Sequence, residues 1–322
     1  MDSFDEADAE SETIVANMES TESTGNWGRW GPDDERGTLN LVTPEAVLGA
    51  TRACRSGKVY SLALPIQRHG VPIFDYRGSP QRLSLTSYAD AGMYAPLGAP
   101  EGRGANEDVL VIASHSITHM DALSHVFSDH VMYNGFGAET FTTAAGAQKL
   151  DITKTGSFAG RGILLDLPRH LDVEWLEPST LVDSEMLESC RAAQGTEIRP
   201  GDILLVRTGW LELFASGAAG FEPGSEGGHE QPGIGFDALS FIDDHDIAAI
   251  GADNAAVEKM PFDRGDFVGV HVELLVKRGV TLMEHLYLSE LSADGCTEFL
   301  LAVGALKVTG AAGSPINPIA IG

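Results

Sequence analysis

Positive charge is scarce in this sequence of 322 residues: 21 Lys and Arg stand against 47 Asp and Glu, which leaves a net charge of −26. Nucleic-acid binding depends on Lys and Arg contacts to phosphate, so this balance excludes a general nucleic-acid binder and argues against an anionic membrane surface as a partner. No apolar run approaches the ~20 residues that a membrane-spanning helix needs. The sequence therefore predicts a protein that binds neither nucleic acid nor membrane.

Cysteine is also scarce. Cys54, Cys190 and Cys296 lie far apart and form neither a zinc-binding spacing nor a disulfide framework. The first ten residues, MDSFDEADAE, contain no basic or apolar signal region. Both observations predict a location in the reducing cytoplasm.

The charge is unevenly distributed. Residues 1–25 contain eight Asp or Glu and no Lys or Arg, which predicts a solvated, disordered acidic tail. The length allows two domains of ~150 residues or one large domain. Because 43% of the residues are hydrophobic and no long linker interrupts residues 26–322, we expect one folded domain there.

Short apolar runs bounded by Gly, Pro or Asp predict buried strands. Cap residues, prolines at a first turn and closing glycines predict helices between them. Strands and helices mix without strict alternation, so we expect an α/β protein with a single mixed sheet. The predicted strands are 59–64, 109–113, 162–167, 203–207, 247–251, 280–283 and 299–308. One predicted helix begins at residue 43, and the others span 183–193, 236–244 and 271–278. Two stretches, 68–104 and 220–235, are predicted to be irregular and to form lids or pocket walls.

A dense group of potential metal ligands follows the predicted strand at 109–113. The segment SHSITHMDALSH, residues 114–125, supplies His115, His119, Asp121 and His125. Imidazole and carboxylate are the preferred ligands of zinc, manganese and iron. On a regular helix Asp121 would point away from His119, so convergence requires a loop leaving the strand. A lone His-x3-His pair is more often structural, but three histidines and an aspartate in so short a segment favour a metal site.

This segment resembles the His-x-Gly-Thr-His-x-Asp-x-Pro-x-His signature of the metal-dependent cyclase superfamily, which includes bacterial kynurenine formamidase, isatin hydrolase and trans-dienelactone hydrolase. Ile117 stands in place of the family's glycine and Leu123 in place of its proline. Isoleucine disfavours positive φ, so we expect the loop to turn without the left-handed region at residue 117. Further similarities cover about residues 26–322: Asn-Trp-Gly at 26–28, the segment 201–210 ending in Arg-Thr-Gly-Trp, Gly-Ala-Asp at 251–253, and Gly-Ser-Pro-Ile at 313–316.

The resemblance implies a site and a fold. It implies that His115, His119 and Asp121 hold a divalent ion, zinc or manganese, and that Asp121 bridges to a second ion held by His271 and Glu284. It implies that His125 is the catalytic acid/base rather than a ligand. The implied fold is the swivelling β/β/α type of the kynurenine formamidases, assembled as a homodimer or homotetramer.

A divalent ion with an open position acidifies water and polarises a carbonyl, and a histidine can carry the proton. These parts fit hydrolysis of an amide, lactam or formamide C–N bond in a small-molecule substrate. Trp27, Phe74 and Arg207 are candidate substrate contacts, although Trp27 can instead anchor the N-terminal segment and Arg207 can form a structural ion pair. Two alternatives use the same metal site: a lactone hydrolase or polyketide-type cyclase, and a non-catalytic protein with a structural ion.

Overall fold

The computed structural model describes residues 25–217 and 230–322. The predicted acidic tail therefore lies outside the described residues, apart from Gly25. Of the second stretch predicted to be irregular, 220–235, residues 220–229 also lie outside the described residues.

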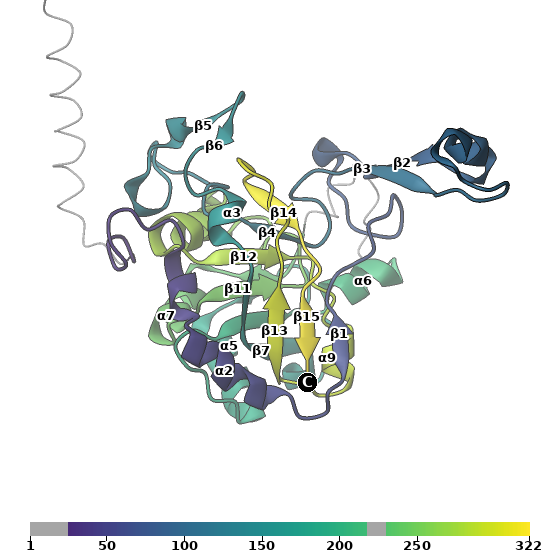
Figure 1. Ribbon diagram of the computed structural model, residues 1–322. Coiled ribbons are helices and arrows are strands. Elements are labelled where there is room, and N and C mark those ends of the chain that lie inside the picture. Colours follow the sequence, from purple (N-terminus) through teal and green to yellow (C-terminus); the bar gives the residue numbers. More distant parts are fainter. Residues whose placement is uncertain (1–24, 218–229) are drawn as a thin grey trace, which may run out of the picture.

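One large mixed sheet organises the chain (Figure 1). Its four central strands, β7, β9, β11 and β12, run parallel to one another. Antiparallel strands extend it on both sides: β13, β15 and β1 beyond β7, and β4 and β14 beyond β12. This confirms the predicted mixed-sheet α/β domain. In sheet order the strands are β1 (Val59–Ser61), β15 (Ile319–Ile321), β13 (Glu298–Val303), β7 (Phe158–Asp166), β9 (Ile203–Arg207), β11 (Ala249–Ala252), β12 (Thr281–Glu284), β4 (His119–Asp121) and β14 (Gly313–Pro315).

The predicted helices form where their cap residues lie. The Asp183 side chain accepts a hydrogen bond from the Met186 amide at 2.8 Å and begins α5, and Gly195, with φ of 66°, ends it. Thr43 caps α2 in the same way. The helices are α2 (Pro44–Ala50), α3 (Ile152–Thr155), α4 (Leu167–Leu171), α5 (Ser184–Gln194), α6 (Trp210–Ser216), α7 (Leu239–Asp244), α8 (Gly269–His271) with a π-helical continuation over Val272–Arg278, and α9 (Ser289–Ala293).

The central strands are buried on both faces. Along β9, Leu204 and Val206 pack into one hydrophobic core, and Ile203 and Leu205 pack into the other. Residues of α5, α7 and the π-helical turn close the first core. A parallel strand covered on both faces is expected to be continuously apolar, as the sequence ILLV of β9 is. No helix in residues 25–217 and 230–322 is long and apolar enough to cross a membrane.

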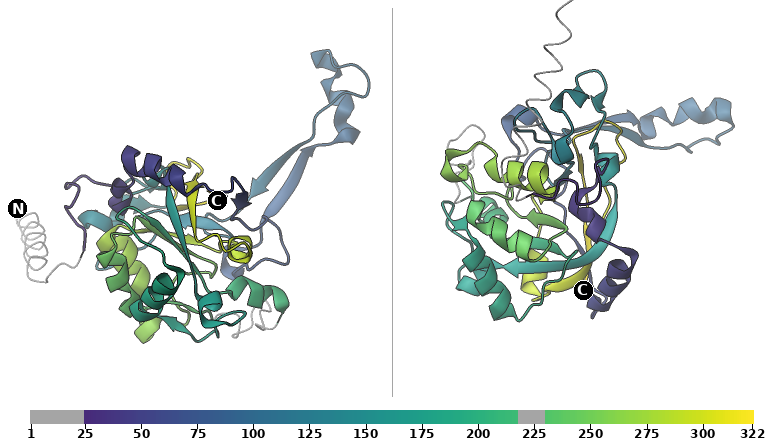
Figure 2. Two further views of the ribbon diagram at one scale, coloured as in Figure 1. Left: turned by 90° about the horizontal axis from the view of Figure 1, so that it is seen from below. Right: turned by 90° about the vertical axis from the view of Figure 1, so that its left-hand side faces the viewer.

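One region differs from the expectation. The run predicted as a buried strand at 109–113 contributes to β3 (Glu107–Val111), but this strand is exposed along its whole length. It pairs with β2 (Gln81–Thr86), which lies in the stretch predicted to be irregular. The two strands form a hairpin that stands out from the body of the molecule (Figure 2). Two small pairs complete the strands: β5 (Phe141–Thr142) with β6 (Gly146–Ala147), and β8 (Leu181–Val182) with β10 (Gly233–Ile234).

Candidate active site

The short strand β4 brings the first candidate ligands together. His119 and Asp121 are two residues apart on a strand, so both side chains project from the same face. β4 pairs with β12 in a register that sets Glu284 directly opposite His119. On the other edge of β4, Gly313 lies opposite Asp121. A Cβ at Gly313 would lie 2.5 Å from Nε2 of His115, so glycine there allows the His115 ring to enter the cluster.

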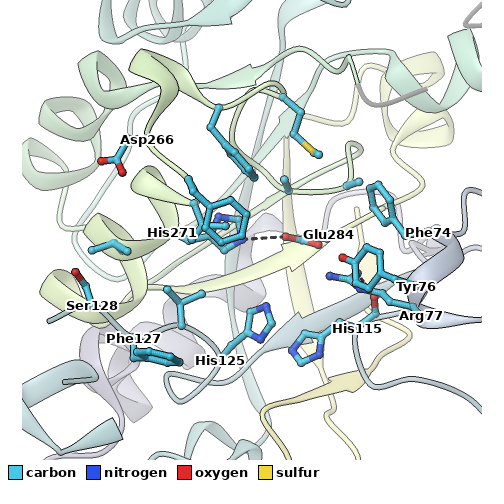
Figure 3. A pocket seen from close by; sticks show the side chains of 18 of the residues that line it. Phe74, Tyr76, Arg77, His115, His125, Phe127, Ser128, Asp266, His271 and Glu284 are labelled. Carbon is cyan, nitrogen blue, oxygen red and sulfur yellow. Dashed lines mark hydrogen bonds and ion pairs between the residues drawn. The ribbon is translucent and has the colours of Figure 1, made fainter. Parts of the chain in front are cut away.

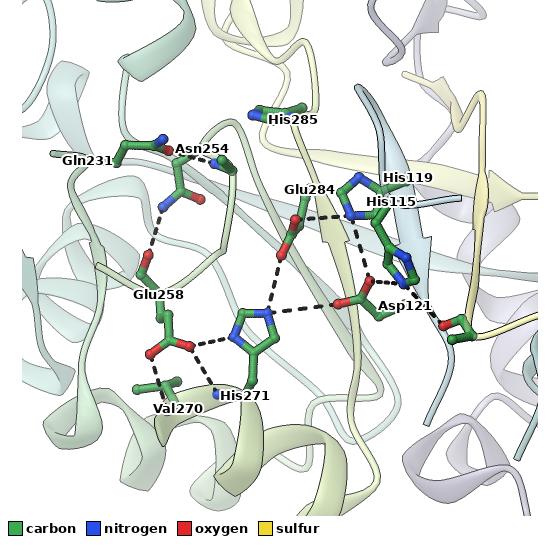
Figure 4. Close-up of polar contacts among 12 residues, drawn as sticks. His115, His119, Asp121, Gln231, Asn254, Glu258, Val270, His271, Glu284 and His285 are labelled. Carbon is green, nitrogen blue, oxygen red and sulfur yellow. Dashed lines mark hydrogen bonds and ion pairs between the residues drawn. The ribbon is translucent and has the colours of Figure 1, made fainter. Parts of the chain in front are cut away.

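Asp121 lies at the centre of this group (Figure 4). Its Oδ1 is 3.3 Å from Nε2 of His115 and 3.6 Å from Nε2 of His119. Nε2 of His119 is also 3.0 Å from Oε2 of Glu284. The sequence-predicted ligands of the first ion therefore converge, with Glu284 beside them.

His271 approaches the cluster from the opposite side, at the start of the π-helical turn. Its Nε2 lies 3.3 Å from Oε1 of Glu284 and 3.9 Å from Oδ2 of Asp121. Asp121 thus directs one carboxylate oxygen toward the first-ion histidines and the other toward His271. The structure brings all five predicted metal ligands into one cluster.

The donor set fits a divalent metal. Nε2 of His119 and both carboxylate oxygens of Asp121 are buried and form no hydrogen bond. A buried carboxylate without partners is costly, and a coordinated cation would remove that cost. Ligand atoms of His115, Asp121 and His125 lie within 4.8 Å of one another, as do those of Asp121, His271 and Glu284. Histidine nitrogens and carboxylate oxygens suit zinc and manganese.

His125 stands at the mouth of this cluster. Its ring stacks on His115, with 3.8 Å between the centroids and 22° between the planes. His125 lines the adjoining cavity, whereas His119 is fully buried and does not. The geometry therefore admits two ligand sets for the first ion that differ in one histidine: His119 or His125 beside His115 and Asp121.

Glu258 holds His271 in place and was not predicted from the sequence. Its Oε1 accepts a hydrogen bond from Nδ1 of His271 at 2.5 Å, and its carboxylate also accepts from the amides of Val270 and His271. With the proton on Nδ1, Nε2 keeps its lone pair toward Glu284 and Asp121. Glu258 has no spacing relation to the other candidate ligands, and no sequence signal links it to His271, which lies 13 residues further on.

The expectation for Ile117 is wrong. This residue has φ of 56°, in the left-handed region that a β-branched side chain disfavours. The turn aims the Ile117 carbonyl at Nδ1 of His119, 2.7 Å away, and toward Nδ1 of His285 at 3.3 Å. Complete burial of the Ile117 side chain offsets a backbone strain of about 1–3 kcal/mol. The strained residue thus orients Nε2 of His119 toward Asp121 and Glu284.

The histidines of the cluster fall into two groups according to whether their pKa is lowered by burial or raised by neighbouring carboxylates. Burial lowers the pKa of His115 to about 2, and it lowers the pKa of His125 as well. Burial also opposes protonation of His271, but hydrogen bonds with Glu258 and Glu284 raise its pKa to about 10. In the absence of an ion, His271 therefore carries a proton that a divalent cation must displace.

The comparisons with known proteins agree with this geometry. A family model described as a putative cyclase matches residues 60–259. The chain belongs to this putative cyclase family. The resemblance of the segment 114–125 to the metal-dependent cyclases is thereby confirmed.

Similar proteins cover most of this cyclase-family chain. A crystal structure described as a novel cyclase is 34% identical, with a TM-score of 0.82 over 92% of this chain and 97% of that one. Cyclase-like protein 3 from Oryza sativa subsp. japonica is 26% identical over 237 residues, which is 71% of this chain and 70% of the rice protein. An isatin hydrolase bound to the product analogue thioisatinate is 18% identical, with a TM-score of 0.59 over 86% and 98% of the two chains, and shares the fold.

A cavity of about 990 Å³ adjoins the metal-ligand cluster of the cyclase fold (Figure 3). His115, His125, His271 and Glu284 line it. Most of the rest of its wall is apolar, and it includes five aromatic side chains. These are Phe74, Tyr76, Phe127, Phe262 and Phe267.

Of the three predicted substrate contacts, only Phe74 lines this cavity. The Trp27 indole instead donates a hydrogen bond to the Val276 carbonyl at 2.6 Å, where the π-helical turn leaves a backbone acceptor to be satisfied. Arg207 is paired with Asp166 and Glu212 at 2.8 and 2.7 Å. Among the described residues, Trp27 and Arg207 therefore make structural contacts and do not line the cavity.

Arg77 is the cationic residue that lines the cavity, and the sequence analysis did not single it out. Its guanidinium lies 5.5 Å from the Phe74 ring centroid and 5.3 Å from that of Tyr76, and it donates a hydrogen bond to the His115 carbonyl. The cavity therefore offers one positive charge between two aromatic rings, beside the metal-ligand cluster.

Proposed function

We propose that this protein is a metal-dependent hydrolase that opens the C–N bond of a small aromatic amide, lactam or formamide. The observation that carries the proposal is the position of the cluster. Buried ligands with unsatisfied atoms, His119 and Asp121, lie behind His115 and His125, which face an aromatic cavity. A purely structural ion would instead be expected in a closed shell of side chains.

His115, His119 and Asp121 would hold one ion, and Asp121, His271 and Glu284 would hold a second. When bound, a divalent ion supplies a Lewis acid that polarises a carbonyl and acidifies water to a pKa of about 7. The protein's own contribution is to hold these ligands in fixed tautomers through Ile117 and Glu258.

His125 is the proposed proton carrier. Hydrolysis adds water across the C–N bond, so the carbonyl carbon gains the hydroxyl group and the nitrogen gains a proton. Burial lowers the pKa of His125, which keeps the ring neutral near pH 7 and able to accept the proton of the attacking water. The same ring then donates the proton to the leaving nitrogen.

The cavity favours a flat aromatic substrate. Its aromatic walls suit stacking, and Arg77 can pair with a carboxylate that the reaction releases. An isatin hydrolase that shares this fold binds the product analogue thioisatinate, which supports a small-molecule substrate for this cavity. The three free thiols Cys54, Cys190 and Cys296 support action in a reducing cytoplasm.

The test combines metal analysis with turnover. The purified protein, loaded with zinc or manganese, is assayed on N-formyl aromatic amines, isatin-like lactams and aromatic lactones in labelled water. We expect the amides or lactams to yield a carboxylate that contains one solvent oxygen, and we expect the His125→Ala protein to bind metal without turnover.

Three other results would contradict the proposal. Turnover of lactones alone would identify a lactone hydrolase. A product without solvent oxygen would identify a cyclase. Tight metal binding without turnover of any substrate on the panel would support a structural ion.

A further inference from the structure

The arginine in the cavity wall has no counter-ion in the protein. Arg77 lines the cavity and is half-buried, yet no carboxylate in residues 25–217 and 230–322 forms an ion pair with it. The three arginines that are buried in these ranges, Arg161, Arg207 and Arg278, each pair with two carboxylates. In a chain with 47 Asp and Glu, the unpaired charge of Arg77 is therefore available to a ligand.

Two aromatic rings and one backbone carbonyl hold the guanidinium of Arg77. Its Cζ lies 5.5 Å from the Phe74 ring centroid and 5.3 Å from that of Tyr76, within the range of a cation–π contact. Its Nη1 donates to the His115 carbonyl. The Nε and Nη2 groups donate to none of the described residues, and the N–H bonds along this edge match the two oxygens of a carboxylate.

Arg77 lies beside the metal-ligand cluster but does not pair with its carboxylates. It contacts the main chain of His115, and it forms no ion pair with Asp121 or Glu284, although Glu284 lines the same cavity (Figure 3). The carbonyl that reacts must reach the ions that these two carboxylates would hold. In the substrate complex, an anion at Arg77 therefore belongs to a second group of the molecule.

We propose that the substrate carries a carboxylate before the reaction, and that Arg77 binds this group while the scissile amide faces the metal-ligand cluster. The inference rests on the proposed function, because it concerns the substrate of the same site. A cavity of about 990 Å³ with aromatic walls has room for an aromatic ring that joins the two groups. The substrate class is then an aromatic amide acid, such as an N-acylated aminobenzoate, and not an uncharged amide.

The surrounding charge makes Arg77 decisive for such a substrate. Arg77 is the one Lys or Arg among the described residues that line the cavity, and Asp266 at its rim is exposed and acidic. The net charge of −26 repels an anion at long range. A substrate carboxylate away from the ions therefore depends on Arg77 for its attraction to the cavity.

Paired substrates on the metal-loaded full chain test the proposal. Formanilide and the ortho, meta and para formamidobenzoates share one scissile formamide, and each takes up water to give formate and an aromatic amine. We expect kcat/KM for at least one formamidobenzoate to exceed that for formanilide by about 10–100-fold, the range of a charge-assisted hydrogen bond. In Arg77→Met this preference should vanish, mainly through KM. Each ratio compares two substrates on one protein, so general damage to the metal site cancels.

Two further variants separate the carboxylate contact from a structural role. Arg68→Met is the matched control, because Arg68 lies earlier in the same segment and also donates to a backbone carbonyl, that of Pro80 at 3.2 Å, but does not line the cavity. It should keep the full preference for the formamidobenzoate. Arg77→Lys keeps the charge and loses the planar edge, so we expect a preference between those of the natural chain and Arg77→Met.

Binding of the amine products gives a readout that does not need turnover. By calorimetry on the metal-loaded protein, the matching aminobenzoate should bind about 10–100-fold more tightly than aniline, and Arg77→Met should remove the difference. Equal kcat/KM for formanilide and all three formamidobenzoates, or a preference that survives in Arg77→Met, would overturn the inference and leave the proposed function standing. Absence of turnover for every substrate would instead count against the proposed function, and aminobenzoate binding would then decide the role of Arg77 by itself.

Discussion

The two halves of the metal-ligand cluster are built in different ways. The first half comes from one segment of the chain, with His115, His119 and Asp121 delivered by a turn and a three-residue strand. The second half comes from separate elements: Glu258 from a loop, His271 from a helix start and Glu284 from the end of β12. Two carboxylates connect the halves: Asp121 faces His271 through one oxygen, and Glu284 lies 3.0 Å from His119 through one of its own.

The halves also differ in how they hold their histidines. His119 donates its Nδ1 proton to a backbone carbonyl, that of Ile117, which carries no net charge. His271 donates to the charged carboxylate of Glu258. A carboxylate partner raises the basicity of a histidine ligand more than a carbonyl does. The charge of Glu258 therefore raises the basicity of His271, whereas the backbone turn at Ile117 mainly orients the His119 ring.

Asp121→Asn should have the largest effect on both halves, because it removes the carboxylate that faces His115 with one oxygen and His271 with the other. We expect loss of both ions and a fall in turnover of at least the ~10²–10⁴ that one essential catalytic group contributes. Metal analysis by mass spectrometry and kcat measure the two effects. Asp183→Asn at the start of α5 is the control, because asparagine caps a helix as well as aspartate does. Retention of both ions in Asp121→Asn would remove Asp121 from the site.

His119→Ala and His125→Ala decide which histidine completes the first half. We expect His119→Ala to lose the first ion, and His125→Ala to keep it while kcat falls by ~10²–10⁴. Burial lowers the pKa of His125, and the proton acceptor must be neutral. We therefore expect kcat/KM to rise with pH, with the midpoint of the rise below ~6.5, the pKa of an ordinary histidine.

That rising limb should shift or vanish in His125→Ala, which is measured with the metal-loaded protein. A folded His125→Ala protein without the first ion would make His125 a ligand and leave the proton carrier to be found elsewhere.

Glu258→Gln should weaken the second half alone. Glutamine keeps the size of the side chain, and its single oxygen can still accept from the His271 amide and Nδ1, but it removes the charge beside His271 and turns an NH2 group toward the Val270 amide. We expect the second ion to bind about 10–100-fold more weakly and the first to be unaffected. Titration calorimetry with zinc measures both. Glu273→Gln, which breaks ion pairs with Lys277 and Arg278 one turn further along, is the control. Equal weakening of both ions would show that the halves do not act separately.

Ile117→Gly should give the smallest effect. Glycine relieves the left-handed strain but loses a buried side chain, so the two changes partly cancel. We expect a loss of about 1–3 kcal/mol in the free energy of unfolding, below the ~2–5 kcal/mol expected for Ile163→Ala in the core at an ordinary backbone angle. Urea unfolding compares them. A larger loss for Ile117→Gly would show that the turn carries no strain.

Local patterns predicted the core strands and the segment that brings three candidate ligands together. The apolar run at 203–207 matches β9 residue for residue, and the His-x3-His-x-Asp spacing pointed to the turn and strand on which His115, His119 and Asp121 converge. Each of these patterns lies within one short segment, because a strand buried on two faces and a turn between candidate ligands are both made by neighbouring residues. They can therefore be read from the sequence alone.

Features that depend on distant contacts were missed. Nothing near Glu258 shows that it will meet His271, since the contact depends on how a loop packs against a helix start. Ile117 was expected to avoid positive φ because local sterics disfavour it there, and the surrounding packing overrides them. The strand Gln81–Thr86 lay hidden among Gly and Pro residues. The run at 109–113 predicted a buried strand because all five residues are apolar, whereas β3 is exposed.

The pairing of β4 with its two neighbours has a consequence for how the protein is made. Thr281 bonds to the Asp121 carbonyl across 160 residues of sequence, and β14, which closes the other edge of β4, lies further along still. Contacts this distant form late, because a long loop must close before they stabilise anything. On the ribosome, β14 is translated after every candidate ligand. A nascent chain can therefore fold the parallel strands around β9 before it is able to retain a metal ion.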